Sequence, residues 1–144
     1  MNELVNQKKI ENMIYEIRGK QVMLDSDLAI LYGTETKRIN EAVKNNKNKF
    51  PERFAWQLTN EEYQNLKSKF STSSLNNYGG RRKLPRVFTE QGVAMLATIL
   101  KSPTATQVSI AIMDTFVLIR RYKITLRIQD KRMRNYAIIL KELN

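Results

Sequence analysis

Short apolar runs lie on both sides of Gly19 and Lys20 near the start of the chain, within residues 13–24. A helix would show apolar residues every three or four positions, whereas short runs that flank a glycine-containing turn are typical of paired strands. We therefore predict a β-hairpin over residues 13–24.

Two short helices are predicted directly after this hairpin, because apolar residues recur at helical spacing on both sides of Gly33. Asp25 is the expected N-cap of the first helix, which would end at Tyr32 with Gly33 as its natural C-terminal residue. The second helix would begin at Thr34 and end at about Asn46. Two short helices that meet at a glycine have the outline of a helix-turn-helix pair.

The middle of the chain alternates between strands, helices and one loop. Residues 54–58 and 86–88 have the composition of strands, and residues 59–62 form a capping box that starts a helix. Thr89 is the expected N-cap of a largely buried helix. Residues 71–86 are polar, small and basic without any period, which predicts an exposed, mobile loop.

A single long helix is predicted after Ser102 and Pro103. Mostly apolar residues there recur at alternating intervals of four and three, which is the heptad pattern of a coiled coil. The members of this seam are Val108, Ile112, Thr115, Ile119, Tyr122, Leu126, Gln129, Met133, Tyr136, Leu140 and Leu143. We expect a homodimer through residues 108–143, and a helix that packs only within its own chain along residues 112–122 is the alternative.

Basic residues crowd the same helix: Arg120, Arg121, Lys123, Arg127, Lys131, Arg132 and Arg134. Like charges that flank a seam would oppose a parallel homodimer, so an antiparallel pair or a helix folded back on its own domain would place them better.

Together, these patterns predict an α+β fold in which a short β-sheet and hairpins support the helix-turn-helix-like pair. That domain would comprise residues 10–101, followed by a C-terminal helix in residues 102–144.

Charge changes this picture by pointing to a partner. The 144 residues include 25 Lys and Arg against 14 Asp and Glu, a net charge of +11, and the excess lies after Gly33. A basic surface gains affinity for polyanions by releasing counterions from phosphates, so double-stranded DNA is the first expected partner.

Cysteine and histidine are absent, which excludes disulfides, zinc fingers and mechanisms that use a thiol or an imidazole.

The chain shows no sign of a membrane segment. Its longest apolar run, residues 110–119, is interrupted by Asp114 and is far shorter than a membrane span. Residues 1–10 are too polar for a signal peptide. We therefore expect no membrane partner and a cytoplasmic location.

The second predicted helix has the two faces that a DNA-reading helix needs. With Ile39 turned inward, its face also carries Thr36, Ala42 and Val43. The opposite face carries Lys37, Arg38, Glu41, Lys44 and Asn45. We expect Arg38, Lys44 and Asn45 to read bases, because arginine on guanine and asparagine on adenine are common major-groove contacts. An ordinary amphipathic helix with a solvated outer face is the alternative.

Cations around this helix are expected to hold phosphates. Lys47, Lys49 and Arg53 follow the helix, and a cluster from Arg81 to Arg86 places four cations within six residues without an acid. A merely solubilising loop is the alternative for this cluster. The complete predicted interface is Thr34, Lys37, Arg38, Glu41, Lys44, Asn45, Lys47, Lys49, Arg53, Arg81, Arg82, Lys83 and Arg86.

No arrangement of residues indicates an enzyme. Asp25 and Asp27 could bind Mg²⁺ with Glu35 or Glu41, but a metal-dependent nuclease also needs a base beside clustered carboxylates, and both aspartates suit the start of a helix. No glycine-rich phosphate loop is present. We expect no enzymatic activity, no cofactor and no metal. RNA or single-stranded DNA is a further alternative ligand, although the aromatic residues lie at core-like spacing.

Several ordered motifs resemble a known family. They read IRGKQVMLD in residues 17–25, LAILYG in 28–33, INEAVKNN in 39–46, FPERF in 50–54 and FTEQGVAMLA in 88–97. This set is similar to the ORF-six-N domain, the N-terminal DNA-binding module of phage and prophage regulators and antirepressors, to which the KilA-N and Bro-N domains are related. The resemblance covers about residues 10–100.

The resemblance implies sequence-specific DNA binding by a phage- or prophage-type transcriptional regulator, without enzymatic activity. Carried onto this chain, the reading helix is residues 34–46, and the helix that contains Gly92 and Val93 is scaffold. In the family a variable C-terminal region often supplies oligomerisation or partner binding. An antirepressor-like protein-interaction module that acts on a repressor partner is therefore the alternative function.

Overall fold

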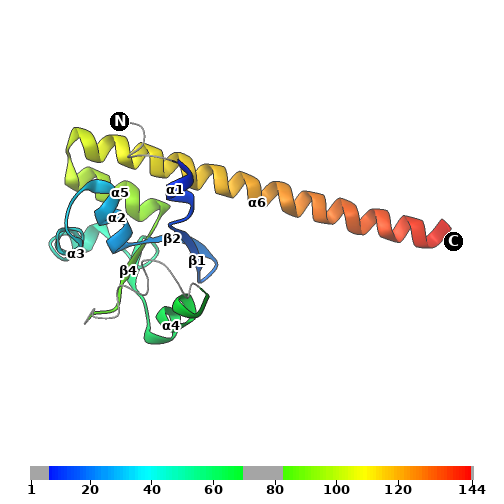
Figure 1. Ribbon diagram of the computed structural model, residues 1–144, viewed down its shortest axis with the longest axis horizontal. Coiled ribbons are helices and arrows are strands. Elements are labelled where there is room, and N and C mark those ends of the chain that lie inside the picture. Colours follow the sequence, from blue (N-terminus) through cyan, green and yellow to red (C-terminus); the bar gives the residue numbers. More distant parts are fainter. Residues whose placement is uncertain (1–6, 70–82, 144) are drawn as a thin grey trace.

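A computed structural model describes residues 7–69 and 83–143 of the chain (Figure 1). The predicted loop at residues 71–86 lies mostly outside the described residues, and so do two predicted interface residues, Arg81 and Arg82. The described residues form an α+β structure with a long C-terminal helix, as the sequence predicts.

The sheet is antiparallel, and its four strands have the order β1 (Ile14–Ile17), β2 (Lys20–Leu24), β4 (Arg86–Thr89) and β3 (Ala55–Gln57) within the described residues. The predicted hairpin is confirmed, because β1 pairs with β2 and Ile17 lies opposite Lys20. Arg18 and Gly19, the two turn residues, have φ values of 58° and 72°. Positive φ at both central residues is the geometry of the two-residue turns that match the twist of a hairpin.

The predicted helix pair is present as α2 (Asp25–Tyr32) and α3 (Thr36–Lys44). Gly33 ends α2 with a φ of 68°, a left-handed conformation that glycine adopts without a steric penalty. The N–H of Gly33 donates to the carbonyl of Ile30, and that of Thr34 donates to the carbonyl of Ala29. This pair of hydrogen bonds closes the end of α2.

The predicted N-cap of α2 and the predicted start of α3 are wrong. Thr34 is tied to the end of α2 by its N–H, so α3 begins two residues later, with an extended Glu35 before it, and ends at Lys44. The N-cap of α2 is Leu24, and Asp25 is the first helical residue. The Asp25 carboxylate is turned instead toward partners on α3 and β4, which are described below with the candidate interface.

The remaining elements follow the predictions more closely. The capping box is formed, since Thr59 and Glu62 exchange backbone-to-side-chain hydrogen bonds of 2.9 and 3.1 Å at the start of α4 (Asn60–Lys69). The Thr89 hydroxyl accepts from the N–H of Gly92 and so caps α5 (Glu90–Leu100), as predicted. The prediction that this helix is largely buried is wrong, since only Gly92, Val93 and Leu96 are buried. Strand β3 is shorter than predicted, and two short helices, α1 (Gln7–Glu11) and the 3₁₀ helix η2 (Lys47–Lys49), were not predicted.

Helices cover both faces of the sheet. On one face Val22, Leu24 and Val87 pack with Tyr63 and Leu66 of α4. On the other face the alternate residues of the strands belong to a larger core, formed with α2, α3, α5 and the start of α6 (Pro103–Leu143). The period of two along each strand therefore divides the apolar side chains between two cores.

Helix α6 begins in the core and leaves it. Its buried residues, from Ala105 to Phe116, complete the larger core, and the Tyr32 hydroxyl of α2 lies 2.6 Å from that of Ser109. From Ile124 to Leu143 every described residue is exposed. Figure 1 shows this part of α6 extending beyond the sheet and the helices packed on it, which we call the body. The division of the chain at residues 101 and 102 stays a prediction. None of the described helices is long and apolar enough to cross a membrane.

Candidate nucleic-acid interface

Helix α3 presents the two faces that the sequence predicts. Ile39, Ala42 and Val43 are buried against the core, which holds the helix in place. The residues predicted to face outward are all exposed: Lys37, Arg38, Glu41, Lys44 and Asn45. In contrast, α2 is buried over nearly its whole length. The second helix of the pair is thus the one that a ligand can reach.

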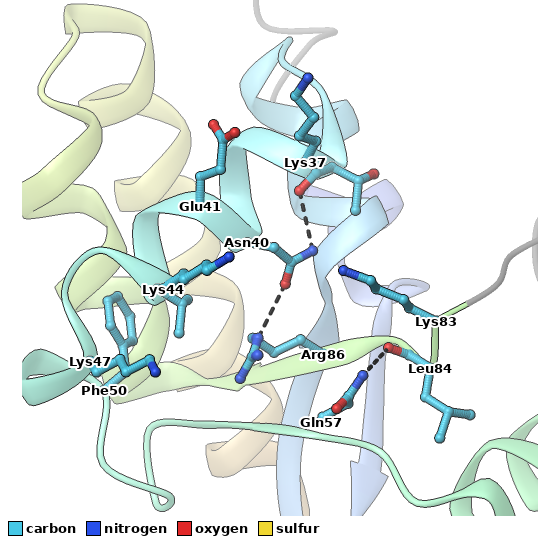
Figure 2. A pocket seen from close by; sticks show the side chains of 12 residues that line it. Lys37, Asn40, Glu41, Lys44, Lys47, Phe50, Gln57, Lys83, Leu84 and Arg86 are labelled. Carbon is cyan, nitrogen blue, oxygen red and sulfur yellow. Dashed lines mark hydrogen bonds between the residues drawn. The ribbon is translucent and has the colours of Figure 1, made fainter.

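An open groove of about 1090 Å³ runs beside α3. It lies between α3, η2 and the ends of β3 and β4, and Figure 2 shows side chains from each of these elements around it. Among the described residues its charged lining comprises Lys37, Glu41, Lys44, Lys47, Lys83 and Arg86. Five cations and one acid make this a positive groove, which favours a phosphate-bearing ligand.

A buried hydrogen-bond network forms the wall of this groove. Asp25, which is fully buried, accepts hydrogen bonds at one oxygen from the Asn40 amide at 2.9 Å and from the Arg86 N–H at 3.1 Å. The Asn40 oxygen in turn accepts from Nε of Arg86 at 3.1 Å, and the Asn40 amide also donates to the Thr36 carbonyl (Figure 2). The network joins α2, α3 and β4, so the Arg86 side chain is held in place at the groove.

Asn40 is a residue that reasoning from the sequence missed. It follows the inward-facing Ile39 on a half-buried flank of α3, where neither the apolar pattern nor the list of exposed cations includes it. Its partners lie 15 and 46 residues away in the chain. Asn40 belongs to the family motif at residues 39–46, but the motif does not state which residues its side chain contacts.

The structure brings part of the predicted interface together. Lys37, Lys44, Lys47, Lys83 and Arg86 share the groove with Glu41. Arg38 and Asn45 do not line it, because at about 100° per residue they are turned roughly a quarter turn from the line of Lys37 and Lys44. They flank the outer face of α3 on the side away from the groove. Thr34 is half-buried in the turn between the helices.

Two further predicted cations lie away from the groove. Lys49 is exposed at the end of η2. Arg53 lies over the Phe54 ring and lines a second hollow of about 690 Å³ beside α6. Two other cations of that hollow are paired with acids, Arg120 with Glu90 at 2.6 Å and Lys123 with Glu16. The second hollow is therefore less positive than the groove beside α3.

Around the groove, the aromatic residues that the structure describes do not form a platform on which bases could stack. Trp56, Tyr63 and Phe88 are buried in the two cores. Phe50 lines the groove but is also buried and meets the Phe88 ring edge to face. The arrangement favours a duplex, which is bound through phosphates and base edges, over a single strand that is bound by stacking.

Acidic residues do not gather into a metal site in the described part of the chain, where no three His, Cys, Asp or Glu residues are close enough to hold an ion. Asp25, which the sequence offers as a possible Mg²⁺ ligand, instead accepts hydrogen bonds at its carboxylate oxygens from the N–H of Ser26, the amide of Asn40 and the N–H of Arg86. Its position is explained by these contacts.

Comparison with known proteins gives one match. Residues 12–99 match the family model of the ORF6N domain, the family that the sequence motifs resemble. No curated protein and no solved structure matches the chain.

Proposed function

The chain belongs to the ORF6N domain family, and from this premise we propose that it is a sequence-specific double-stranded DNA-binding protein that regulates transcription, of phage or prophage type. Helix α3 is the reading helix of this proposal. The observation that carries it is the positive groove beside an exposed, firmly seated helix.

The dimensions suit a DNA major groove. An α-helix fits into the major groove, which is about 12 Å wide, and places its outer side chains against base edges. The outer face of α3 carries Arg38, Lys44 and Asn45, residue types that make bidentate or charged contacts with guanine and adenine. Glu41 lies between them and suits the amino group of cytosine.

The groove beside α3 suits the phosphates next to the bases being read. Lys37, Lys47 and Arg86 line it from α3, η2 and β4, and Lys83 lines it from the segment before β4. Because α3 and β4 share one core and the Asp25 network, the spacing of Lys37 and Arg86 does not have to be created on binding. Lys49, Arg81 and Arg82 would extend the contact along the backbone, and Thr34 would meet it at the turn. Arg53, which lines the second hollow, has no part in the groove.

The test is binding to a randomised duplex library at two salt concentrations, because phosphate attraction weakens with salt and base reading does not. We expect an enriched motif that survives the higher salt. Arg38→Ala and Asn45→Ala should each relax the preference at one or two positions by about 1 to 3 kcal/mol. Lys131→Ala, which removes a cation from the far part of α6, should leave the motif unchanged.

Salt-labile binding without a motif would contradict the reading role of α3. Equal losses for Arg38→Ala on the enriched and on random duplexes would contradict the base contact assigned to that residue. We also propose that the protein has no enzymatic activity, so supercoiled plasmid incubated with it and Mg²⁺ should remain intact. Cleavage that is inseparable from the purified protein would refute this part.

A further inference from the structure

The far part of α6 has a concentration of exposed apolar side chains that the DNA-binding proposal does not explain. Thirteen large apolar residues are exposed in the described parts of the chain, and all of them except Ile30 lie on α6. Tyr122, Met133 and Tyr136 are each about two-thirds exposed. Contiguous exposed apolar surface of this kind marks an interaction site.

Six of the twelve on α6 lie, together with Gln129, on one stripe along the far part of the helix. We call it the distal seam, and its members are Tyr122, Leu126, Gln129, Met133, Tyr136, Leu140 and Leu143. A heptad repeat falls behind a straight helix by about 20° per heptad. The three heptads from Val108 and Ile112 to the middle of the distal seam therefore turn the stripe by about 60°. The buried face of α6 also includes Ser109 and Phe116, which move its centre further from the stripe, so the middle of the distal seam lies roughly a quarter turn from the centre of that face.

The cations of α6 lie outside the distal seam. Arg120, Arg127, Arg134 and Lys141 recur every seven residues at one outer position of the heptad. The charged positions that border the seam are Lys123, Asp130 and Arg132. In a parallel, in-register pair these would meet Leu118, Thr125 and Ala137 of the second copy, so no two like charges are brought together. The like-charge objection to a parallel pair therefore does not apply to this phase of the helix.

We propose that a second copy of this chain covers the distal seam and that the two α6 helices form a parallel, in-register coiled coil. The single polar member, Gln129, favours this orientation. In a parallel pair it lies opposite Gln129 of the second copy, and the two amides satisfy each other. An antiparallel pair would place each Gln129 opposite an apolar seam residue, which buries an amide without a partner.

The bodies do not obstruct this pair. Each body lies roughly a quarter turn from the distal seam, so a two-fold axis along the seam places the two bodies on opposite sides of the helix pair. The dimer itself does not depend on DNA binding. If α3 reads DNA as proposed, a dimer of this kind implies that the DNA sequence it binds has two-fold symmetry.

The first test compares two acidic substitutions by measuring mass in solution. Leu126 and Ile128 are 43% and 49% exposed, two residues apart, but only Leu126 belongs to the distal seam. We expect the wild type and Ile128→Glu to have twice the 16.9 kDa mass of the chain, and Leu126→Glu to have the single mass with unchanged helical content. A wild type that is monomeric up to high concentration would overturn the proposal and leave a repressor helix as the occupant.

The second test uses the absence of cysteine from the chain. In a parallel pair each seam residue meets its own copy, so Gln129→Cys and Tyr136→Cys should both form an intermolecular disulfide on oxidation. Lys131→Cys, at an outer position, should not. Crosslinking of at most one seam position would overturn the parallel orientation. A dimer that shows no DNA motif would refute the proposed function and leave the dimer standing, so the two failures can be told apart.

Discussion

Gly92 lies in the first turn of α5, directly against the backbone that enters β3. A β-carbon built at this position would lie 2.0 Å from the Phe54 carbonyl oxygen, and the same oxygen accepts hydrogen bonds from the N–H and the hydroxyl of Thr89. The clash is with backbone that is itself held in place. Here glycine is needed because of the close approach of two chain segments.

We predict that Gly92→Ala destabilises the protein by about 3 kcal/mol, measured by urea denaturation. Gly33→Ala is the matched control, because Gly33 has a φ of 68° but nothing within 4 Å of the added carbon. Gly33→Ala should lower the free energy of unfolding only by the cost of the left-handed backbone, about 1 kcal/mol. Equal losses in the two variants would show that α5 moves away from Phe54 freely.

A second contact at the scale of single residues ties the hairpin turn to α4. The Arg18 guanidinium donates two hydrogen bonds to Glu62, at 2.7 and 3.2 Å, and lies over the Trp56 ring. The hydrogen bond from Arg18 lowers the pKa of Glu62 below its usual 4.5. A carboxyl whose pKa is lowered on folding stabilises the protein above its unfolded pKa, and this contribution is lost as the pH falls through the lowered value.

We therefore predict that Arg18→Gln lowers the free energy of unfolding at neutral pH and that this difference from wild type shrinks as the pH falls below 4.5. Urea denaturation at several pH values measures it. Arg53→Gln, which removes an exposed cation that lies over Phe54, should give a difference that changes little over the same range. A constant difference for Arg18→Gln would mean that its stacking on Trp56, and not its ion pair, carries the effect.

At the scale of elements, the network around Asn40 sets how firmly α3 is held. Asn40 satisfies a buried oxygen of Asp25 and the Nε of Arg86 at once. Its removal takes one hydrogen bond from each of these groups, although the Asp25 oxygen keeps the N–H of Arg86. A hydrogen bond to a charged group contributes about 1.5 to 3 kcal/mol. The groove also loses the contact that positions Arg86.

Asn40→Ala should therefore reduce both the stability of the protein and its affinity for any duplex, as measured by denaturation and by titration with DNA. Asn45→Ala, the same substitution on the exposed side of α3, should leave the stability within about 0.5 kcal/mol of wild type. A stable Asn40→Ala variant that binds DNA normally would show that the core contacts of Ile39 and Val43 suffice to hold α3.

Elements whose cause is local could be predicted from the sequence. The hairpin, the end of α2 at Gly33 and the capping box of Thr59 each depend on residues that are neighbours in the chain. The start of α3 was misplaced because the N–H of Thr34 is used by the preceding helix. Asp25 and Asn40 could not be assigned, because their partners come from distant segments that only the fold brings together.

The same division applies to the candidate interface. The outward face of α3 follows from periodicity, since Ile39, Ala42 and Val43 fix which side is buried. That Lys83 and Arg86 join Lys37 and Lys44 in one groove depends on the pairing of β2 with β4, which residue spacing does not reveal. Arg53 is expected beside α3 for its nearness in the chain, but it precedes β3 and lines the second hollow, whereas the other end of β3, at Gln57, reaches the groove.

At the scale of the whole molecule, the chain has a net charge of +11, and five of its cations line the groove. These cations determine how binding responds to salt. Each phosphate that a cation neutralises releases counterions, so the affinity falls with salt concentration in proportion to the number of such contacts. We predict that Lys47→Ala reduces the slope of log Kd against log salt concentration by about one per chain, equally on specific and random duplexes.

Titrations at several salt concentrations measure this slope. Lys131→Ala serves again as the control, since it removes the same charge from the exposed end of α6. An equal decrease in the two slopes would mean that binding responds to total charge and not to the groove.

Helix α6 runs from Pro103 to Leu143 without a break, from the core of the body to its far end. Because the helix has no break, a rotation of one end about the helix axis also rotates the other end. One residue inserted after Lys123 would turn everything beyond it by about 100° and move it by about 1.5 Å, whereas seven residues would return it nearly to its original phase. Length changes in this part of the chain are thus also changes of angle, and insertions of whole heptads disturb the angular setting of the two ends least.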